Sequence, residues 1–167
     1  MFQTFVKRGF SVLRFNFRGV GRSQGRFDNG QGELSDAAAA IDWMQTHNAN
    51  ASDCWIGGFS FGAWISMQLM MRRPEINGFI SIAPPASLHD FSFLAPCPSS
   101  GMIIHGSTDD IIPIESVDKL AQKVSAQKNI KIDYRVIDGG DHFFAEHIDV
   151  LSEHVEDYLD KALKTAA

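Results

Sequence analysis

Three residues of the types used in nucleophilic catalysis follow one another along the chain: Ser60, Asp109 and His142. A serine hydroxyl is a weak nucleophile until a base removes its proton, and imidazole suits that task because it titrates near neutral pH. A carboxylate such as Asp109 would fix the tautomer of His142 and stabilise the imidazolium that forms. The order serine, aspartate, histidine therefore predicts acyl transfer through a covalent intermediate on Ser60.

Ser60 stands at the centre of the pentapeptide GFSFG, residues 58–62, which has the pattern GxSxG. An apolar stretch that predicts a strand, Cys54–Phe59, precedes it, and a stretch typical of a buried helix follows it. A serine on such a tight turn is exposed, and the residues beside it must be small because the two backbones nearly touch. At the helix start, the backbone N–H of Phe61 is predicted to stabilise the oxyanion.

Each of these residues also has a structural interpretation. A serine before a helix is often only the N-cap, and Asp109 or Asp110 could be a turn or cap residue ahead of Pro113. Taken together, in this order and each just after a predicted strand, the three residues favour catalysis over those separate roles. Within the acidic pair, we assign the orienting carboxylate to Asp109.

Two kinds of cofactor site compete for the same residues or for the glycine-rich loop. A metal site would use the carboxylates and histidines near the predicted strand ends: Asp109, Asp110, Asp141, His142 and His147. The two histidines are five residues apart, which does not place both on one helical face. A dinucleotide site at Gly19 and Gly21 would need its third glycine one residue before Gly25, and no helix is predicted to open there. We therefore predict neither a metal nor an organic cofactor.

The elements that must position these residues alternate between strands and helices. Strands are predicted at residues 11–17, 54–59, 78–83, 101–105 and 130–137. Helices are predicted to end before Gly9, to begin at Glu33, to follow Ser60, to span residues 117–124 and to run over residues 144–162.

This alternation indicates a parallel sheet that helices cover on both faces, because most of the strands are apolar almost throughout. Residues 130–136 instead alternate between apolar and polar side chains, as an edge strand does. The predicted fold is an α/β sandwich of three layers. Its candidate catalytic residues meet at the carboxyl ends of the strands, where ligands bind in such sheets.

Length and composition set further bounds. We predict a single domain over residues 1–167, with no lid, since the loop at residues 84–98 is short. A net charge of −5 without a dense basic cluster gives nucleic-acid binding little support. Two cysteines make no disulfide framework, and Cys54 is predicted to be a buried thiol. No apolar stretch is long enough to cross a membrane and the first ten residues lack the order of a signal peptide, so we predict a cytoplasmic protein.

Four motifs together resemble one family: FNFRGVGRS at residues 15–23, GFSFGA at 58–63, HGSTDDIIP at 105–113 and GGDHFF at 139–144. The chain resembles the alpha/beta-hydrolase superfamily, and in it the small lidless bacterial group related to dienelactone hydrolases and S33-type serine peptidases. In the family's HGxxD motif the acid falls on Asp109. Dienelactone hydrolases carry cysteine, instead of serine, at the turn between strand and helix, which is called the nucleophile elbow. The serine at position 60 therefore argues against that activity. The family usually has aspartate where this chain has Asn16, just before the RGxGxS loop.

The resemblance also implies three further strands ahead of residues 11–17, and a loop after the third that supplies a second oxyanion donor. That third strand would lie between residues 11–17 and Cys54–Phe59, so we expect either a gap in the sheet or a re-paired strand. A missing oxyanion donor costs about 10²–10³ in rate. We expect the 167 residues to be an N-terminally shortened record of a longer hydrolase.

The sequence therefore predicts a serine hydrolase that cleaves an ester, thioester or similar acyl bond in a small molecule. A non-catalytic or decayed hydrolase domain and an S33-like peptidase remain the alternatives. Several phenylalanines near the predicted site could line an apolar acyl pocket, although most are predicted to pack in the core: Phe59, Phe61, Phe91, Phe93, Phe143 and Phe144.

Overall fold

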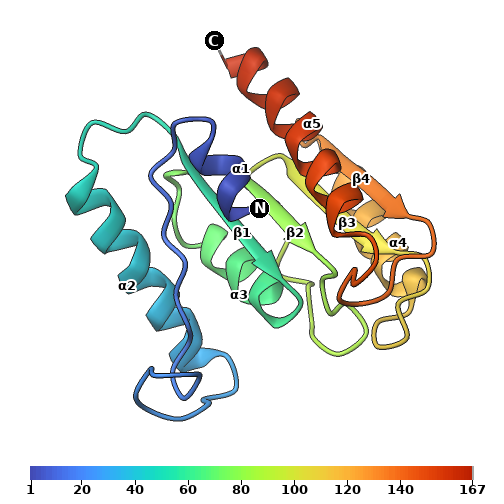
Figure 1. The fold of residues 1–167 in the computed structure, drawn as a ribbon, viewed down its shortest axis with the longest axis horizontal. Coiled ribbons are helices and arrows are strands. Elements are labelled where there is room, and N and C mark those ends of the chain that lie inside the picture. Colours follow the sequence, from blue (N-terminus) through green and yellow to red (C-terminus); the bar gives the residue numbers. More distant parts are fainter. Residues whose placement is uncertain (167) are drawn as a thin grey trace.

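The computed structural model describes residues 1–166 and shows a parallel sheet with helices on both faces (Figure 1). Its four strands are neighbours in chain order: β1 (Cys54–Phe59), β2 (Ile76–Ile82), β3 (Gly101–Gly106) and β4 (Ile132–Ile137). The helices are α1 (Phe2–Val6), α2 (Gln31–His47), α3 (Phe61–Met70), α4 (Ile114–Ser125) and α5 (Ile148–Ala166). The predicted three-layer α/β fold is confirmed, and β4 is an edge strand as its alternating pattern predicted.

The two faces of the sheet are buried by different helices, which explains why nearly every residue of β2 and β3 is buried. Successive side chains of a strand point to opposite faces. In β2, Phe79 joins the cluster formed with α2, α3 and α4, whereas Ile80 joins the cluster formed with α1 and α5. In β3, Ile103 and Ile104 divide in the same way.

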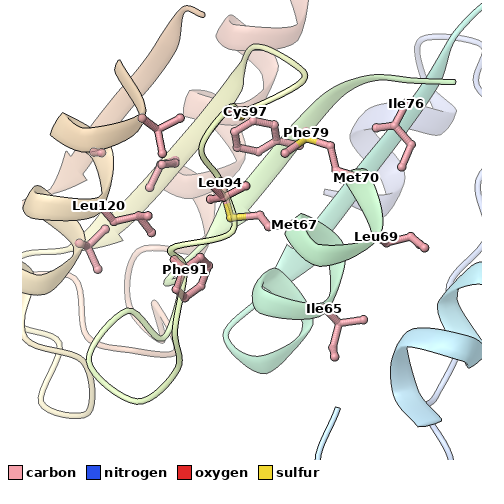
Figure 2. Close-up of a cluster of buried hydrophobic side chains, with 14 of the residues drawn as sticks. Ile65, Met67, Leu69, Met70, Ile76, Phe79, Phe91, Leu94, Cys97 and Leu120 are labelled. Carbon is pink, nitrogen blue, oxygen red and sulfur yellow. The ribbon is translucent and has the colours of Figure 1, made fainter. Parts of the chain in front are cut away.

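The larger of the two hydrophobic clusters lies between the sheet and helices α3 and α4 (Figure 2). Figure 2 shows the loop after β2 carrying Phe91, Leu94 and Cys97 into the space between α3 and α4. Their relative exposures are 6%, 1% and 5%, so this proline-rich loop is part of the core. The loop therefore holds α3 in place beneath the nucleophile elbow.

The strand predicted at residues 11–17 is not formed, and that prediction is wrong. The sheet ends at β1, and residues 11–17 run past it as irregular backbone between α2 and the sheet (Figure 1). An extended segment becomes a strand only when a neighbour pairs with its backbone, and no described strand pairs with this one. Of the two expected outcomes, the gap is the one observed, and Leu13 and Phe15 are both 39% exposed.

The other element boundaries differ from prediction by a few residues. α2 begins at Gln31 instead of Glu33, and β2 begins at Ile76. α5 begins at Ile148, not at Phe144, because Phe144 has a left-handed φ of 54° that a helix cannot include. None of the helices described has both the length and the apolar character that crossing a bilayer requires.

Glu33 anchors the start of α2 and gives a first prediction. Its carboxylate is 1% exposed and accepts hydrogen bonds from the backbone N–H groups of Asp28 and Gly30, both at 2.8 Å. Burial alone would raise the pKa of Glu33, but these donors outweigh it and hold the pKa below its usual value. Glu33→Gln keeps the shape of the side chain but places an NH₂ group against one of the two N–H donors. We therefore expect the free energy of unfolding, measured in urea, to fall by about 1–3 kcal/mol.

The matched control is Glu115→Gln, at an exposed position in the first turn of α4, where we expect little change. The pKa of Glu33 is lower in the folded than in the unfolded protein, so its ionised carboxylate stabilises the fold at a pH above the unfolded pKa. This stabilisation is lost as the pH falls and the carboxylate takes up a proton. The stability difference between wild type and Glu33→Gln should therefore shrink on acidification below pH 4.5, the ordinary value for glutamate. A difference that is independent of pH would contradict this account.

Candidate active site

The three residues predicted to cooperate are brought together in one hydrogen-bonded chain. Ser60 Oγ lies 3.0 Å from His142 Nε2, and His142 Nδ1 lies 2.7 Å from Asp109 Oδ2. Because an ionised carboxylate only accepts, Nδ1–H donates to Asp109 and leaves the Nε2 lone pair to accept the Ser60 proton. The side chains of Asp109 and His142 are 0% and 4% exposed, so water competes little for these bonds.

Ser60 occupies the strained turn that the GxSxG pattern predicted. Its backbone has φ 49° and ψ −120°, between the end of β1 and the first residue of α3. The Ser60 N–H donates to the carbonyl of Ile82 at 2.8 Å, which fastens the turn to the end of β2. A serine is held in this unfavourable conformation only because its surroundings determine it, as is common at functional sites.

The two glycines of the elbow are not equivalent, which corrects the expectation that both must be small. A Cβ placed on Gly58 would collide with the backbone of Gly62 and Ala63, so β1 and α3 do nearly touch there. A Cβ placed on Gly62 would meet no atom within 4 Å outside its chain neighbours and the adjacent backbone of its own helix. The backbones of Gly58 and Gly62 approach closely, but only Gly58 must lack a Cβ for that approach.

This difference predicts contrasting effects of the same substitution. Gly58→Ala forces strand and helix apart, so we expect it to destabilise the fold by about 1–3 kcal/mol or more and to abolish hydrolysis. Gly62→Ala should fold at least as well as wild type, since alanine is up to about 1 kcal/mol better than glycine within a helix. Thermal unfolding and hydrolysis measured on both variants test this. Equal damage from the two substitutions would contradict the structural account of the elbow.

The loop after β3 fixes the carboxylate that orients His142. Asp109 Oδ1 accepts the backbone N–H groups of Ile111 at 2.9 Å and Ile112 at 2.7 Å, which leaves Oδ2 for the histidine. Asp110 is exposed one residue further along. The structure therefore brings Asp109, and not Asp110, to the histidine.

His105 is a buried neighbour of this carboxylate, and the sequence patterns did not predict a role for it. Its ring is 0% exposed, its Nε2–H donates to the Ile112 carbonyl at 3.0 Å, and Nε2 lies 3.7 Å from Asp109 Oδ2. Burial lowers the pKa of His105, which favours the neutral form of the ring. His105 thus helps to hold the Asp109 loop, and its place at the start of the HGSTDDIIP motif was the available signal.

The loops that carry Asp109 and His142 are joined through their backbones. A Cβ on Gly106 would collide with Gly140, so the end of β3 touches the turn after β4. Both the N–H and the hydroxyl of Thr108 donate to the Gly140 carbonyl at 3.0 Å. The two glycines permit this contact, which places His142 next to Asp109 although 33 residues separate them.

The N-terminus of α3 offers one donor for an oxyanion. Phe61 is the first residue of α3, where backbone N–H groups have no acceptor within the helix and where the positive end of the helix dipole lies. The Phe61 ring packs with Phe17 and Phe27, at centroid distances of 5.9 and 5.7 Å. The second donor that the resemblance implies stays a prediction.

The residues weighed for cofactor sites have other surroundings. Within residues 1–166, no three His, Cys, Asp or Glu side chains lie together in a way that could hold a metal ion. Gly19, Gly21 and Gly25 have φ values of 74°, 59° and 90°, and they form tight turns well before α2 begins at Gln31. They do not open a helix as a dinucleotide site requires.

Comparisons with known proteins place the chain among its relatives. The sequence model of the X-Pro dipeptidyl-peptidase (S15) family matches residues 1–130. An uncharacterized protein of Rickettsia prowazekii is 53% identical over 162 residues, which cover 95% of this chain and 68% of that protein.

Solved structures match as well. A protein of unknown function from Agrobacterium tumefaciens, described as a candidate alpha/beta hydrolase, has a TM-score of 0.96 and 56% identity, covering 98% of this chain and 75% of that one. An alpha/beta serine hydrolase without lid from Xanthomonas campestris has a TM-score of 0.80 and 32% identity, covering 89% of this chain and 65% of that one.

The resemblance drawn from the four motifs is therefore confirmed at the level of the lidless alpha/beta serine hydrolases. The matching family model is that of the S15 peptidases, whereas the motifs had suggested the dienelactone hydrolase and S33 groups. Fold neighbours and family model agree that the chain is a hydrolase. The chain belongs to the alpha/beta-hydrolase superfamily, and within it to the X-Pro dipeptidyl-peptidase (S15) family.

Proposed function

We propose that this chain is a serine hydrolase that cleaves an ester, thioester or similar acyl bond of a small molecule through Ser60, His142 and Asp109. The observation that carries the proposal is the unbroken hydrogen-bonded chain from Ser60 Oγ through His142 to Asp109, at 3.0 and 2.7 Å. If the three residues served only as helix caps or turn residues, their side chains would not need to meet, and Ser60 would not need a strained backbone.

The geometry supports a two-step reaction. His142 Nε2 takes the Ser60 proton as Oγ attacks the acyl carbon, and the Phe61 N–H donates to the oxyanion. Asp109 stabilises the imidazolium, which then gives its proton to the departing alcohol or thiol. Water, activated by the same imidazole, attacks the acyl-enzyme and releases the acid and Ser60. The steps require no metal or organic cofactor.

A peptidase is the second candidate, because the matching family is that of the X-Pro dipeptidyl-peptidases. Such an enzyme would need groups that recognise a peptide amino terminus and a proline, and we assign none of the residues near Ser60 to that role. Acyl esters are therefore the proposed substrates. Cytoplasmic location stays a prediction.

Pre-steady-state hydrolysis of p-nitrophenyl acetate tests the proposal. We expect a burst of p-nitrophenol that approaches one equivalent per chain, followed by slower turnover as acetyl-Ser60 hydrolyses. Glycyl-prolyl p-nitroanilide tests the peptidase under the same conditions. Folded protein that gives neither a burst nor turnover with either compound would favour the non-catalytic alternative, and preference for the anilide would favour the peptidase.

A further inference from the structure

Two phenylalanines beside the histidine remain exposed although their side chains are large and apolar. Phe59 is 39% exposed and Phe143 is 62% exposed. Their ring centroids each lie 5.2 Å from the ring of His142 and 6.0 Å from one another. The imidazole therefore stands against an aromatic wall, which we define as Phe59 and Phe143.

Other phenylalanines near the site are buried. The adjacent Phe144 is 1% exposed, because its left-handed backbone turns it into the cluster beneath α5. Phe91, also among the phenylalanines considered from the sequence, is 6% exposed and packs with α3 and α4. Phe59 and Phe143, unlike Phe91 and Phe144, stay at the surface, and both contact the catalytic imidazole.

The chemistry of the site decides which part of a substrate meets this wall. The leaving oxygen must approach His142 Nε2, since that nitrogen supplies the proton it needs. The carbonyl oxygen must instead point to the Phe61 N–H at the start of α3. The group attached to the leaving oxygen is thereby placed on the His142 side of the acyl carbon, where Phe59 and Phe143 lie.

We infer that Phe59 and Phe143 bind the alcohol portion of the substrate and select esters of apolar, above all aromatic, alcohols. This inference rests on the proposed function and extends it from the bond cleaved to the leaving group preferred. An aryl ring can pack against the wall in offset or edge-to-face geometry and remove its exposed apolar surface from water. A short alkyl alcohol covers little of that surface.

A comparison of benzyl acetate with ethyl acetate isolates this contact. Both esters form the same acetyl-enzyme and release primary alcohols of similar acidity, so a difference in kcat/KM reports binding of the leaving group. We expect wild type to prefer benzyl acetate by at least about tenfold, and Phe143→Ala or Phe59→Ala to reduce that preference about tenfold. Phe143→Leu, which keeps an apolar side chain, should retain part of it.

Two further measurements separate recognition from a structural role. Deacylation of the common acetyl-enzyme should be unchanged in the Phe143 variants, because the alcohol has already left. Phe27→Ala removes a 63% exposed ring that contacts Phe61 instead of His142, and it should leave the benzyl-to-ethyl ratio unaltered.

An equal rate for the two esters in wild type, or a ratio unchanged by both alanine variants, would overturn the inference while leaving the proposed function intact. The inference would also be overturned if the alanine variants lowered kcat/KM for both esters and the deacylation rate by the same factor, since that pattern indicates damage to the triad. If folded wild type forms no acetyl-enzyme from either ester, the proposed function fails and the inference falls with it.

Discussion

Replacing Ser60 with alanine is expected to lower ester hydrolysis by at least about 10⁴-fold and to remove the p-nitrophenol burst. The reason is that Ser60 Oγ is the only group on the elbow that can carry the acyl intermediate, and His142 has no other hydroxyl within reach among its described contacts. The side chain makes one hydrogen bond, to His142, so the fold should be preserved. Burst kinetics and thermal unfolding measure the two effects separately.

Ser87→Ala is the matched control, since Ser87 is an exposed serine in the loop after β2. It should give a full burst and wild-type turnover. Retention of the burst in Ser60→Ala would show that another residue carries the acyl group.

The second large effect is expected from Asp109→Asn, which should lower kcat about 10⁴-fold. The amide oxygen can still accept from the N–H groups of Ile111 and Ile112, which places the NH₂ group against His142 Nδ1. That nitrogen must then accept, so the proton moves to Nε2 and points at Ser60. An imidazole in this tautomer cannot remove the serine proton.

Asp110→Asn makes the same chemical change at the exposed neighbouring position and should leave kcat within about twofold of wild type. The pair distinguishes the loss of a particular contact from the loss of a negative charge near the site. Similar activity in the two variants would contradict the assignment of Asp109.

The meeting of the three catalytic candidates could be predicted from their order along the chain and from their positions just after predicted strands. Ser60 and Asp109 each follow an apolar run that predicts a buried parallel strand, His142 follows the alternating run that predicts an edge strand, and the carboxyl ends of parallel strands share one edge. The HGxxD motif further separated Asp109 from Asp110. The meeting of the three residues was therefore predictable without knowledge of any contact.

What was missed depends on neighbours that a local pattern does not contain. Residues 11–17 have the composition of a strand, yet no described strand pairs with them. The pattern GxSxG treats both glycines alike, whereas a Cβ would collide with backbone across the turn only at Gly58. The burial of His105 and the exposure of Phe59 depend likewise on long-range packing.

The most direct test of the central claim is the site of covalent modification by a fluorophosphonate, which reacts with a serine only when a base activates it. Wild-type protein is incubated with the probe, digested, and the modified peptide is identified by mass spectrometry. The account predicts one adduct, on Ser60, that is absent from Ser60→Ala and strongly reduced in Asp109→Asn. Folded wild-type protein that carries no adduct, or carries it on a different residue, would contradict the account.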